Sequence, residues 1–454
     1  MTFLVHLAMF GWPLLGILAF RMLPARKAVL LVVIGGWLFL PTTAYPMPGL
    51  PDYTKGFAIV LGAALGMLFY AGHWLDTARF GWCDLPMLAW CLVPAASSYA
   101  NGHPMYDAVS VTLGSTVEWG LPYLFGRVLF RDLGGIDKLA RGLFIGGLVY
   151  VPFCLYEVRM SPQLHATVYG FAQHSFNQHM RGGGYRPLVF MEHGLMVGLW
   201  MAAASIAGFS LWRYGGLRRL FGMPVLPLLL LLGGTTVLCK SLGALVLMGV
   251  GIAAVVALRR TGGALPGYTL MAVPAVFVGA RVLGGWQAKE VVELIGQHAP
   301  ERASSVAFRI RSEEAFMSGI WEHPLLGWSA WGFTPPMGPE EEPLTYAFDS
   351  FWLITVTCFG LIGLTLFFVV HYAPITSLLR HTTQRRWAHP RMAGVAALVA
   401  VVCIFVADCM FNAMINPIYT VVVGGLVSLA SGVTSRAGEA RSTMLVRDRM
   451  HAWS

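Results

Sequence analysis

Residues 392–432 read MAGVAALVAVVCIFVADCMFNAMINPIYTVVVGGLVSLASG and contain one charged side chain, Asp408. They form two apolar runs, 392–410 and 416–432, each close to the length of about 20 residues that a membrane-spanning helix needs. The whole chain of 454 residues has this character, with 56% hydrophobic and 12% charged residues, whereas an ordinary soluble domain has roughly 25% charged residues. This composition excludes a soluble globular enzyme and a disordered protein. It predicts an all-α, polytopic transmembrane helical bundle.

Working outward from that segment, the hydropathy pattern predicts thirteen spans. They are 3–20, 28–42, 57–74, 84–99, 108–130, 142–156, 188–211, 223–239, 242–258, 264–282, 350–372, 392–410 and 416–432. Four of these runs are short or interrupted by proline, so the expected number is twelve to fourteen. The first run is followed by basic residues and has no basic segment before it, which favours a retained first helix over a cleaved signal peptide.

The distribution of Lys and Arg predicts the topology, because cytoplasmic loops collect basic residues. If the loop 21–27 is cytoplasmic and the spans alternate, 21 of the 31 Lys and Arg residues are cytoplasmic, and the N-terminus is outside. The ten outer ones are Lys55, Arg159, Arg181, Arg186, Lys240, Arg281, Lys289, Arg302, Arg309 and Arg311. The formal charge of +9 therefore needs no nucleic-acid partner, and none is expected.

The same alternation predicts the domain organisation. Residues 1–282 hold the first ten spans with a periplasmic loop at 157–187, and residues 283–349 form a large periplasmic loop. Residues 350–432 hold the last three spans, and 433–454 form a cytoplasmic tail. The predicted cytoplasmic loops are too short for a nucleotide-binding domain and contain no GxxxxGK[ST] motif. Any chemistry is therefore expected on the outer face or within the bilayer.

The first candidate site is the segment from Arg181 to Gly194, which contains three consecutive glycines before Tyr185 and Arg186. Glycines allow a ligand to approach the backbone, and each arginine can bind a pair of anionic oxygens. Glu192 and His193 are predicted to lie one to two helical turns inside the span 188–211, where ionisable residues usually face a polar cavity. A flexible loop with a Glu–Arg pair joining two helices is the structural alternative.

Two further groups carry outer cations. Lys240 lies in a tight turn between two spans, where it either reaches a lipid phosphate or extends to the headgroups with no further role. In the large loop, helical spacing places one set of residues on a single face, which predicts an amphipathic helix on the outer membrane surface. That set is Arg302, Ser305, Arg309, Glu313 and Phe316, with Arg311 nearby. Anion binding is favoured over an exposed helix with a weak Arg309–Glu313 pair.

Acidic residues complete the candidate site. Asp349 begins the span 350–372 and is either a helix N-cap or a catalytic base. Asp408, Asn412 and Asn416 are weaker candidates for a cavity wall, and the isolated Glu118 is expected to pair helices. No HExxH or DxD motif occurs, so neither a metal nor another cofactor is expected. A site with several arginines and no metal suits a diphosphate leaving group that arginine neutralises.

The order of these features resembles the O-antigen ligase and O-antigen polymerase superfamily over roughly residues 140–430. The segments that carry the resemblance are Arg181–Gly194, Cys239–Leu247, Arg309–Trp321, His323–Phe333 and Phe348–Leu353 before Gly360–Gly363. These enzymes are integral membrane glycosyltransferases that use polyprenyl-diphosphate-linked glycans on the outer face of the bacterial inner membrane. The match consists of short, degenerate motifs in a common order.

The resemblance implies that arginines hold the donor diphosphate while an acceptor hydroxyl attacks the anomeric carbon. Arg186 matches the first family arginine, and Arg309 or Arg311 matches the loop arginine. Two positions depart from the family pattern. Lys240 precedes Ser-Leu-Gly where Ser-Arg-Gly is common, and Asp349-Ser350 stands where ligases carry a His-Asn pattern. The second departure favours the polymerase branch.

The sequence therefore predicts a metal-independent polymerase of exopolysaccharide, O-antigen or capsule, acting on a polyprenyl-diphosphate-linked glycan donor and acceptor. Membrane lipid, a chain-length regulator and export proteins are the expected further partners. A ligase that transfers glycan to lipid A core or protein, and a flippase, are the alternatives. Aromatic side chains expected to stack on sugar rings, or to anchor the protein at the membrane interface, are Tyr185, Trp321, Trp328 and Trp331.

Overall fold

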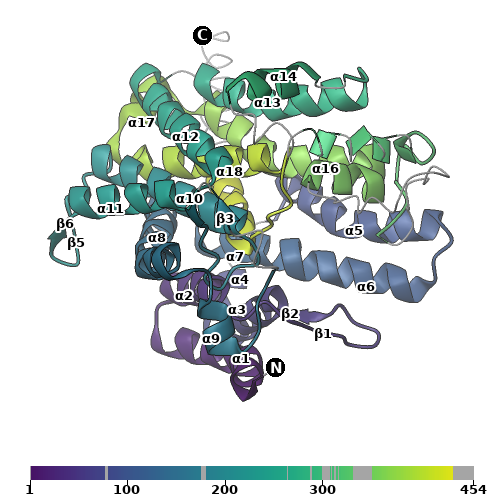
Figure 1. The fold of residues 1–454 in the computed structure, drawn as a ribbon, viewed down its shortest axis with the longest axis horizontal. Helices are drawn as coiled ribbons and strands as arrows, with labels where there is room; N and C mark the ends of the chain where they lie inside the picture. The colour runs from purple at the N-terminus through teal and green to yellow at the C-terminus, as the bar shows by residue number, and fades with distance from the viewer. Residues whose placement is uncertain are drawn as a thin grey trace, which may run out of the picture.

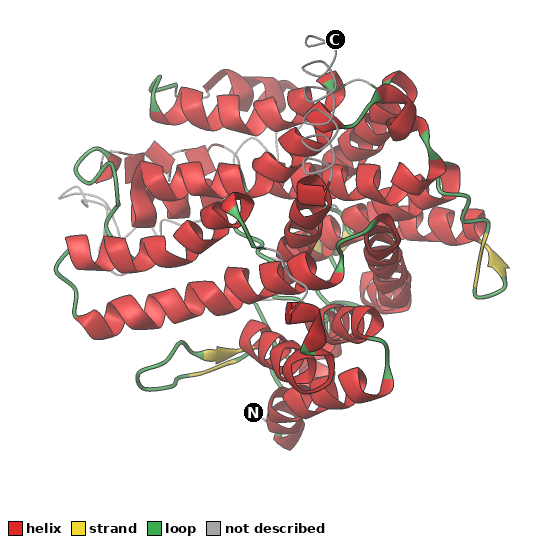
Figure 2. Ribbon diagram, turned by 180° about the vertical axis from the view of Figure 1, so that it is seen from behind, coloured by secondary structure: helices red, strands yellow, loops and turns green. Residues whose placement is uncertain are grey.

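A computed structural model gives the fold (Figure 1). It describes residues 2–76, 80–174, 180–181, 183–262, 264–286, 289–298, 307, 309–310, 313–314, 316–317, 319–330 and 350–432. Figure 2 shows that most of this part of the chain is helical, with loops and a few short strands between the helices. The strands form three two-stranded hairpins: β1 (Ala44–Tyr45) with β2 (Tyr53–Thr54), β3 (Met180–Arg181) with β4 (Gly184–Tyr185), and β5 (Arg219–Leu220) with β6 (Met223–Pro224).

A helix lies in each of the thirteen predicted ranges. The longer helices are α1 (Phe3–Met22), α2 (Ala25–Phe39), α3 (Lys55–Ala71), α5 (Leu85–Ala100), α6 (Met105–Ser115) continued by a π-helical turn (Thr116–Gly120) and α7 (Leu121–Leu129), α8 (Leu133–Met160), α10 (Gly194–Arg213), α11 (Val225–Leu238), α12 (Leu242–Thr261), α13 (Leu265–Val282), α14 (Lys289–His298), α16 (Phe351–His381), α18 (Ala393–Asp408) and Pro417–Gly432. Short helices are α4 (His73–Asp76), α9 (Leu164–Tyr169) and α17 (Gln384–Ala388).

Seven of the described helices are long and apolar enough to cross a membrane. The centre of the bundle consists of α10 and α18, whose apolar windows are 89% and 83% buried inside the protein. Elsewhere small residues bring helices into close contact. A Cβ at Gly16 of α1 would lie 2.6 Å from the backbone of Gly62 in α3. Close approach at small residues is typical of helix packing in membranes, and the fold is that of a helical membrane bundle.

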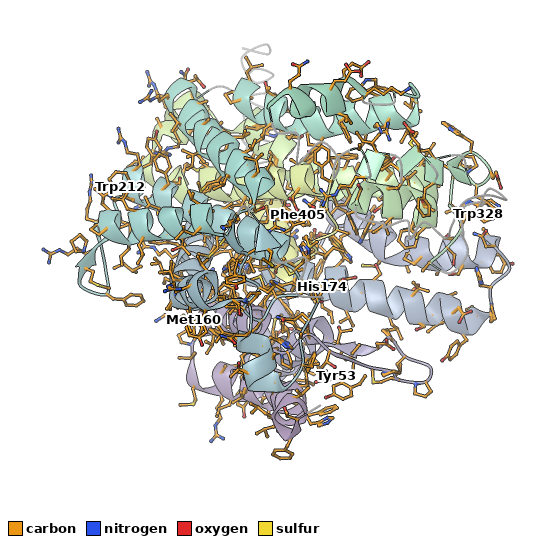
Figure 3. All side chains as sticks on the ribbon, viewed as in Figure 1. Tyr53, Met160, His174, Trp212, Trp328 and Phe405 are labelled. Atoms are coloured by element: carbon orange, nitrogen blue, oxygen red, sulfur yellow. The ribbon has the colours of Figure 1, made fainter. Side chains whose placement is uncertain are left out.

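The loops gather at two ends of the bundle, as alternating spans require. At one end, called the basic end, Arg26 pairs with Asp132, and Gln384 bonds to the Thr261 carbonyl. At the other, called the long-loop end, Lys55 bonds to the Phe190 carbonyl at 2.8 Å. Figure 1 shows the β5–β6 hairpin and the β1–β2 hairpin projecting from opposite sides of the molecule. Trp212 and Trp328 lie on these opposite sides in Figure 3.

Helix α16 is broken at Gly360, so the predicted continuous span 350–372 is wrong. Gly360 has φ 65° and ψ −165°, a backbone conformation that is essentially restricted to glycine. The rings of Phe351 and Phe367 lie 5.3 Å apart, although sixteen residues of straight helix would separate them by about 24 Å. The first nine residues of α16 therefore fold back against the remainder, and Leu361–His381 is the part long enough to span.

A distant loop fills this break. The amides of Trp328 and Ser329 donate to the carbonyls of Thr357 and Cys358 at 2.8 and 3.0 Å, and the amide of Leu361 donates to Pro324 at 2.8 Å. These bonds satisfy the backbone amides and carbonyls that have no partner where the helix is interrupted. Inside a membrane protein such groups need a partner within the protein.

Candidate functional site

The loop before α10 forms one wall of the candidate site at the long-loop end. The buried carboxylate of Glu157, at the end of α8, accepts hydrogen bonds from the amides of Leu164, Leu188 and Val189 at 2.9, 2.8 and 2.7 Å. Val189 has a positive φ of 55°, which is strained for a β-branched residue. Its carbonyl also accepts from the Gln173 side chain at 2.9 Å, so contacts on both sides hold the strained conformation.

Because of these bonds, residues 188–193 are not helical and α10 begins at Gly194. The prediction that Glu192 and His193 lie inside a span is therefore wrong. Glu192 lies in the loop that precedes the helix and is exposed. His193 is the N-cap of α10, and its Nδ1 accepts from the Leu195 amide at 3.1 Å. The apolar residues Leu188–Met191 extend the hydrophobic run, which explains why hydropathy placed the helix start too early.

The structure brings Arg186 and Lys240 together. Arg186 is 5% exposed, and its Nη2 donates to the carbonyl of Lys240 at 3.0 Å. A Cβ at Gly194 would lie 2.2 Å from the Arg186 side chain, and a Cβ at Gly184 would lie 2.4 Å from Lys240 Nζ. Glycine at position 194 leaves room for the inner part of the Arg186 side chain, whereas the flexible end of Lys240 could move away from a side chain at position 184. Lys240 itself has a φ of 51°, as expected in a tight turn.

Lys55, Glu118 and Glu192 form a second group, called here the central cluster. Glu192 attracts the ammonium of Lys55 and repels the carboxylate of Glu118. Glu118 lies in the π-helical turn of the helix that runs from Met105 to Leu129, and its side chain is exposed. Ionisable residues within apolar helices usually face a polar space. The prediction that Glu118 pairs two helices stays a prediction, and Glu192 is a nearby charge that acts on Glu118.

Lys55 is 4% exposed and has few degrees of freedom. Its Nζ donates to the Phe190 carbonyl at 2.8 Å and lies 5.1 Å from the centroid of the Trp37 ring. A buried ammonium is costly unless partners surround it, and the Phe190 carbonyl and the Trp37 ring hold Lys55 in place.

Arg309 and Asp408 form a third group. Arg309 lies in a helical stretch of the large loop, and its guanidinium interacts electrostatically with the Asp408 carboxylate at the end of α18. Asp408 also accepts from Asn412 Nδ2 at 2.8 Å. Asn412 Oδ1 and Asn416 Nδ2 are among the buried polar atoms that have no hydrogen-bond partner within the described part of the chain.

The described residues of the stretch around Arg309 are buried or partly buried, which favours a packed helix over the alternative of an exposed one. Glu313 is 3% exposed and pairs with Arg281 at 3.1 Å, while the Ser350 hydroxyl donates to it at 2.7 Å. Burial raises the pKa of Glu313, and the bonds from Ser350 and Arg281 offset part of this effect. Phe316 and Ile320 on the same stretch are buried as well.

A short series of contacts links the second and third groups. Trp119, next to Glu118, stacks on Phe351 with the ring centroids 5.6 Å apart. The Phe351 amide donates to the carbonyl of Asn412 at 3.3 Å, and Asn412 bonds to Asp408. The folded-back half of α16 thus lies between the central cluster and the Arg309–Asp408 group.

The predicted aromatic residues have different surroundings. Tyr185 is half-buried in β4, beside Arg186, and Trp321 is 53% exposed. Trp328 packs on His323 with the ring centroids 3.9 Å apart, and its Nε1 donates to the Gly319 carbonyl at 2.9 Å. Its backbone also fills the α16 break, so Trp328 stabilises the fold.

Several predicted site residues lie outside the described part of the chain: Arg302, Arg311, Trp331 and Asp349. The backbone of Arg181 forms β3, and its side chain is outside the described part. Among the described residues, no group of three or more His, Cys, Asp or Glu side chains is arranged to hold a metal ion.

Sequence reasoning did not select Lys55 or Glu157. Lys55 was one of the ten outer cations. It follows the loop 41–54, and nothing in that loop indicates which residues Lys55 contacts. Glu157 stands at the C-terminal end of a span, where a carboxylate opposes the helix dipole. That unfavourable position is the signal that could have identified it as a residue with a specific partner.

One prediction about stability concerns His165, which lies in α9 at the long-loop end. Its Nε2 accepts from the Thr42 amide at 3.1 Å, and its Nδ1 donates to the Phe171 carbonyl at 2.8 Å, so the folded protein holds the neutral ring. Burial, and then the nearby Lys55 charge, lower the pKa of His165 below its usual value of 6.5. Its contribution to stability is therefore present above pH 6.5 and is lost as the pH falls through the lower folded pKa.

We expect the melting temperature of the purified protein to decrease as the pH falls from 7 towards 5, and His165→Gln to remove part of this decrease. His323→Gln, which changes a half-buried histidine with no part in this contact, is the control. If the melting temperatures of wild type and His165→Gln depend on pH in the same way, His165 is not the group that causes the decrease.

No protein-family model matches this sequence, and no curated protein matches it.

Proposed function

We propose that the protein is a bacterial inner-membrane glycosyltransferase that polymerises polyprenyl-diphosphate-linked glycan repeats on the periplasmic face. The observation that supports it best is the convergence of cations and carboxylates from separate parts of the chain at the long-loop end. Arg186 donates to the carbonyl of Lys240, and Glu192 interacts electrostatically with Lys55 and Glu118. In this proposal the bundle has about thirteen crossings, with the N-terminus and the long loops in the periplasm.

In the proposed reaction, Arg186 and Lys240 bind the diphosphate of the donor, and Arg309 approaches from the large loop. The acceptor hydroxyl attacks the anomeric carbon, and a new glycosidic C–O bond forms as the bond to the phosphate oxygen breaks. The leaving diphosphate keeps the electron pair, and the cations stabilise its charge. The hydroxyl proton passes to the Glu192 carboxylate.

Glu192 suits the role of base better than His193. Since Nδ1 of His193 accepts the Leu195 amide hydrogen, the neutral ring carries its hydrogen on Nε2. In this state His193 donates a hydrogen bond to a substrate oxygen and cannot also accept the hydroxyl proton. Asp349 remains the second candidate for the base.

A transporter of lipid-linked glycan is the second candidate function, and the break in α16 is the observation that favours it. Discontinuous helices line the binding sites of many transporters. In the present structure, however, the loop 324–329 already satisfies the backbone groups at the break.

The test uses cells whose own gene is replaced by variants that are expressed at equal levels, with gel analysis of lipid-linked glycans. We expect Arg186→Ala and Glu192→Gln each to reduce polymer at least 100-fold, with single lipid-linked repeats accumulating on the periplasmic side. Arg159→Ala and Glu322→Gln, at exposed positions of the same end, should leave the polymer unchanged.

The alternatives give different results. A ligase defect would accumulate full-length polymer on the lipid carrier. A transporter defect would accumulate single repeats that external periodate cannot oxidise. An unchanged polymer ladder in both Arg186→Ala and Glu192→Gln would show that these two residues do not form the active site.

A further inference from the structure

A large cavity lies at the basic end, away from the site described above. Its volume is about 890 Å³, within the usual range for ligand pockets. It lies between the start of α8, the ends of α16 and Pro417–Gly432, and the segment that leads into α18. The charged side chains that line it are Arg131, Asp132, Asp137, Arg141, Arg386 and Arg391.

The charges of this cavity favour an anion. Four arginines and two aspartates leave a formal charge of +2. Both aspartates already have basic partners, because Asp132 pairs with Arg26 and Asp137 pairs with Arg141. Arg386 and Arg391 are exposed to the cavity mouth and form no ion pair with any residue that the structure describes. A concave surface of one sign strengthens the local potential.

The segment that carries these two arginines is held in place. Arg259 of α12 is 6% exposed, and its guanidinium donates to the backbone carbonyls of Trp387, Ala388 and His389. The Trp387 side chain is fully buried. Because the backbone on which Arg386 and Arg391 stand is fixed, an anion meets a site that is largely formed in advance.

Helix dipoles add to the positive potential. Helix α8 begins at Leu133 and α18 begins directly after Met392, and both of these residues line the cavity. The N-terminal ends of helices carry a partial positive charge that stabilises phosphate groups. The first residues of both helices border the cavity, although the Asp132 carboxylate already caps the α8 end by accepting from the Gly135 amide at 2.8 Å.

We propose that this cavity binds the phosphate of an anionic phospholipid headgroup through Arg386 and Arg391. The position favours a lipid over a free anion, since the cavity lies at the end of an apolar bundle, where headgroups gather. A second, mostly apolar cavity of about 340 Å³ opens beside it. The two share neighbouring residues on the same helices: Ser377 and Ser431 line the apolar cavity, and Leu378 and Gly432 line the basic one.

The charge of the C-terminal tail makes it a poor ligand for the basic cavity. Residues 433–454 contain four arginines, one glutamate and one aspartate, so the tail and the cavity have the same sign. A lipid phosphate has the opposite sign.

The test measures thermal unfolding of the full-length protein in detergent with added phosphatidylglycerol, phosphatidylcholine or inorganic phosphate. We expect phosphatidylglycerol to raise the melting temperature of the wild type by several degrees more than phosphatidylcholine does, and native mass spectrometry to show one retained anionic lipid. The double variant R386Q/R391Q should need at least tenfold more phosphatidylglycerol for half of the effect. The double variant R218Q/R219Q changes two exposed arginines at the same end and is the matched control.

Each other outcome overturns the proposal. Equal weakening in both double variants would show a diffuse attraction to the basic end. The same stabilisation by inorganic phosphate would show a site for a small free anion, and equal stabilisation by both lipids would show no selection for charge. Since all four substituted arginines are exposed, the melting temperatures without lipid should match the wild type, which checks that the variants fold.

Discussion

Replacing Gly360 by alanine will destabilise the protein by at least about 3 kcal/mol, because two independent costs add. A non-glycine residue at φ 65° and ψ −165° is strained, which costs of order 1–3 kcal/mol. The new Cβ would also lie 2.3 Å from the backbone of Leu325. Backbone atoms cannot move aside as a flexible side chain can, so the loop 324–329 must leave the break and expose the amides of Leu361 and Ile362.

The measurement is the melting temperature of the purified protein, with Gly249→Ala as the matched control. Gly249 lies in α12, and a Cβ there would have no neighbour within 4 Å. Gly249→Ala should leave stability equal or slightly higher, since alanine is the better helix former by about 1 kcal/mol. Equal melting temperatures for the two variants would show that α16 is not broken as described.

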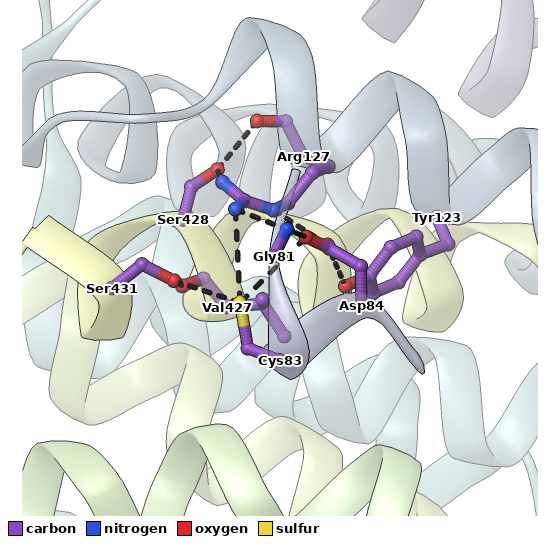
Figure 4. A network of polar contacts seen from close by, with 8 residues as sticks. All are labelled: Gly81, Cys83, Asp84, Tyr123, Arg127, Val427, Ser428 and Ser431. Carbon is purple, nitrogen blue, oxygen red and sulfur yellow. Dashed lines mark hydrogen bonds and ion pairs between the residues drawn. The ribbon is translucent and has the colours of Figure 1, made fainter. Parts of the chain in front are cut away.

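Replacing Asp84 by asparagine will cost about 3–5 kcal/mol, the usual effect of removing one partner of a buried ion pair. Arg127 and Asp84 form a bidentate pair at 2.8 and 3.3 Å, with the two side chains only 6% and 13% exposed. Tyr123 donates to the same carboxylate at 2.6 Å, and Arg127 also donates to Ser428 at 2.7 Å (Figure 4). The ion pair thus joins α7 to the start of α5, and the bond to Ser428 joins α7 to Pro417–Gly432. Asparagine would remove the carboxylate charge that pairs with the guanidinium.

The matched control for this prediction is Asp137→Asn. Its pair with Arg141 is at 2.6 Å, but the side chains are 40% and 32% exposed, so the loss should be about 0.3–0.5 kcal/mol. Thermal unfolding of both variants in the same detergent gives the comparison. A similar small effect in both would mean that water reaches Asp84.

Acid should reduce the difference between wild type and Asp84→Asn. Burial raises the pKa of Asp84, but the bonds from Arg127, Tyr123 and Gly81 outweigh it and hold the pKa below its usual 3.8. The contribution of the carboxylate is therefore present above about pH 4 and disappears as the pH falls through the lower folded value.

The helices could be predicted from the sequence because apolar runs of the right length leave the backbone no alternative in a membrane. Errors arose where backbone bonding from distant residues decides the local structure. The run from Leu188 continues into α10, but Glu157 accepts the amides that a helix there would use. Likewise, the break at Gly360 depends on the loop 324–329, which no local pattern reveals.

The sequence predicted which residues lie at the candidate site, but it did not predict which of them contact one another. The rule that basic residues avoid the outer face selected Arg186, Lys240 and Arg309, and two of these are in contact in the structure. Nothing in the sequence shows that Glu192 interacts with Lys55 and Glu118, because these interactions depend on how two distant helices pack near the loop before α10. The same is true of the cavity at the basic end.

The most direct test of the central claim uses purified protein in vesicles with a defined polyprenyl-diphosphate oligosaccharide, followed by gel analysis of chain length. The wild type should produce chains of several repeats and release free polyprenyl diphosphate, while Glu192→Gln should do so at least 100-fold more slowly and Glu322→Gln at the normal rate. If the well-folded wild type leaves the oligosaccharide at its original length, or if Glu192→Gln extends it as fast as the wild type, the account is contradicted.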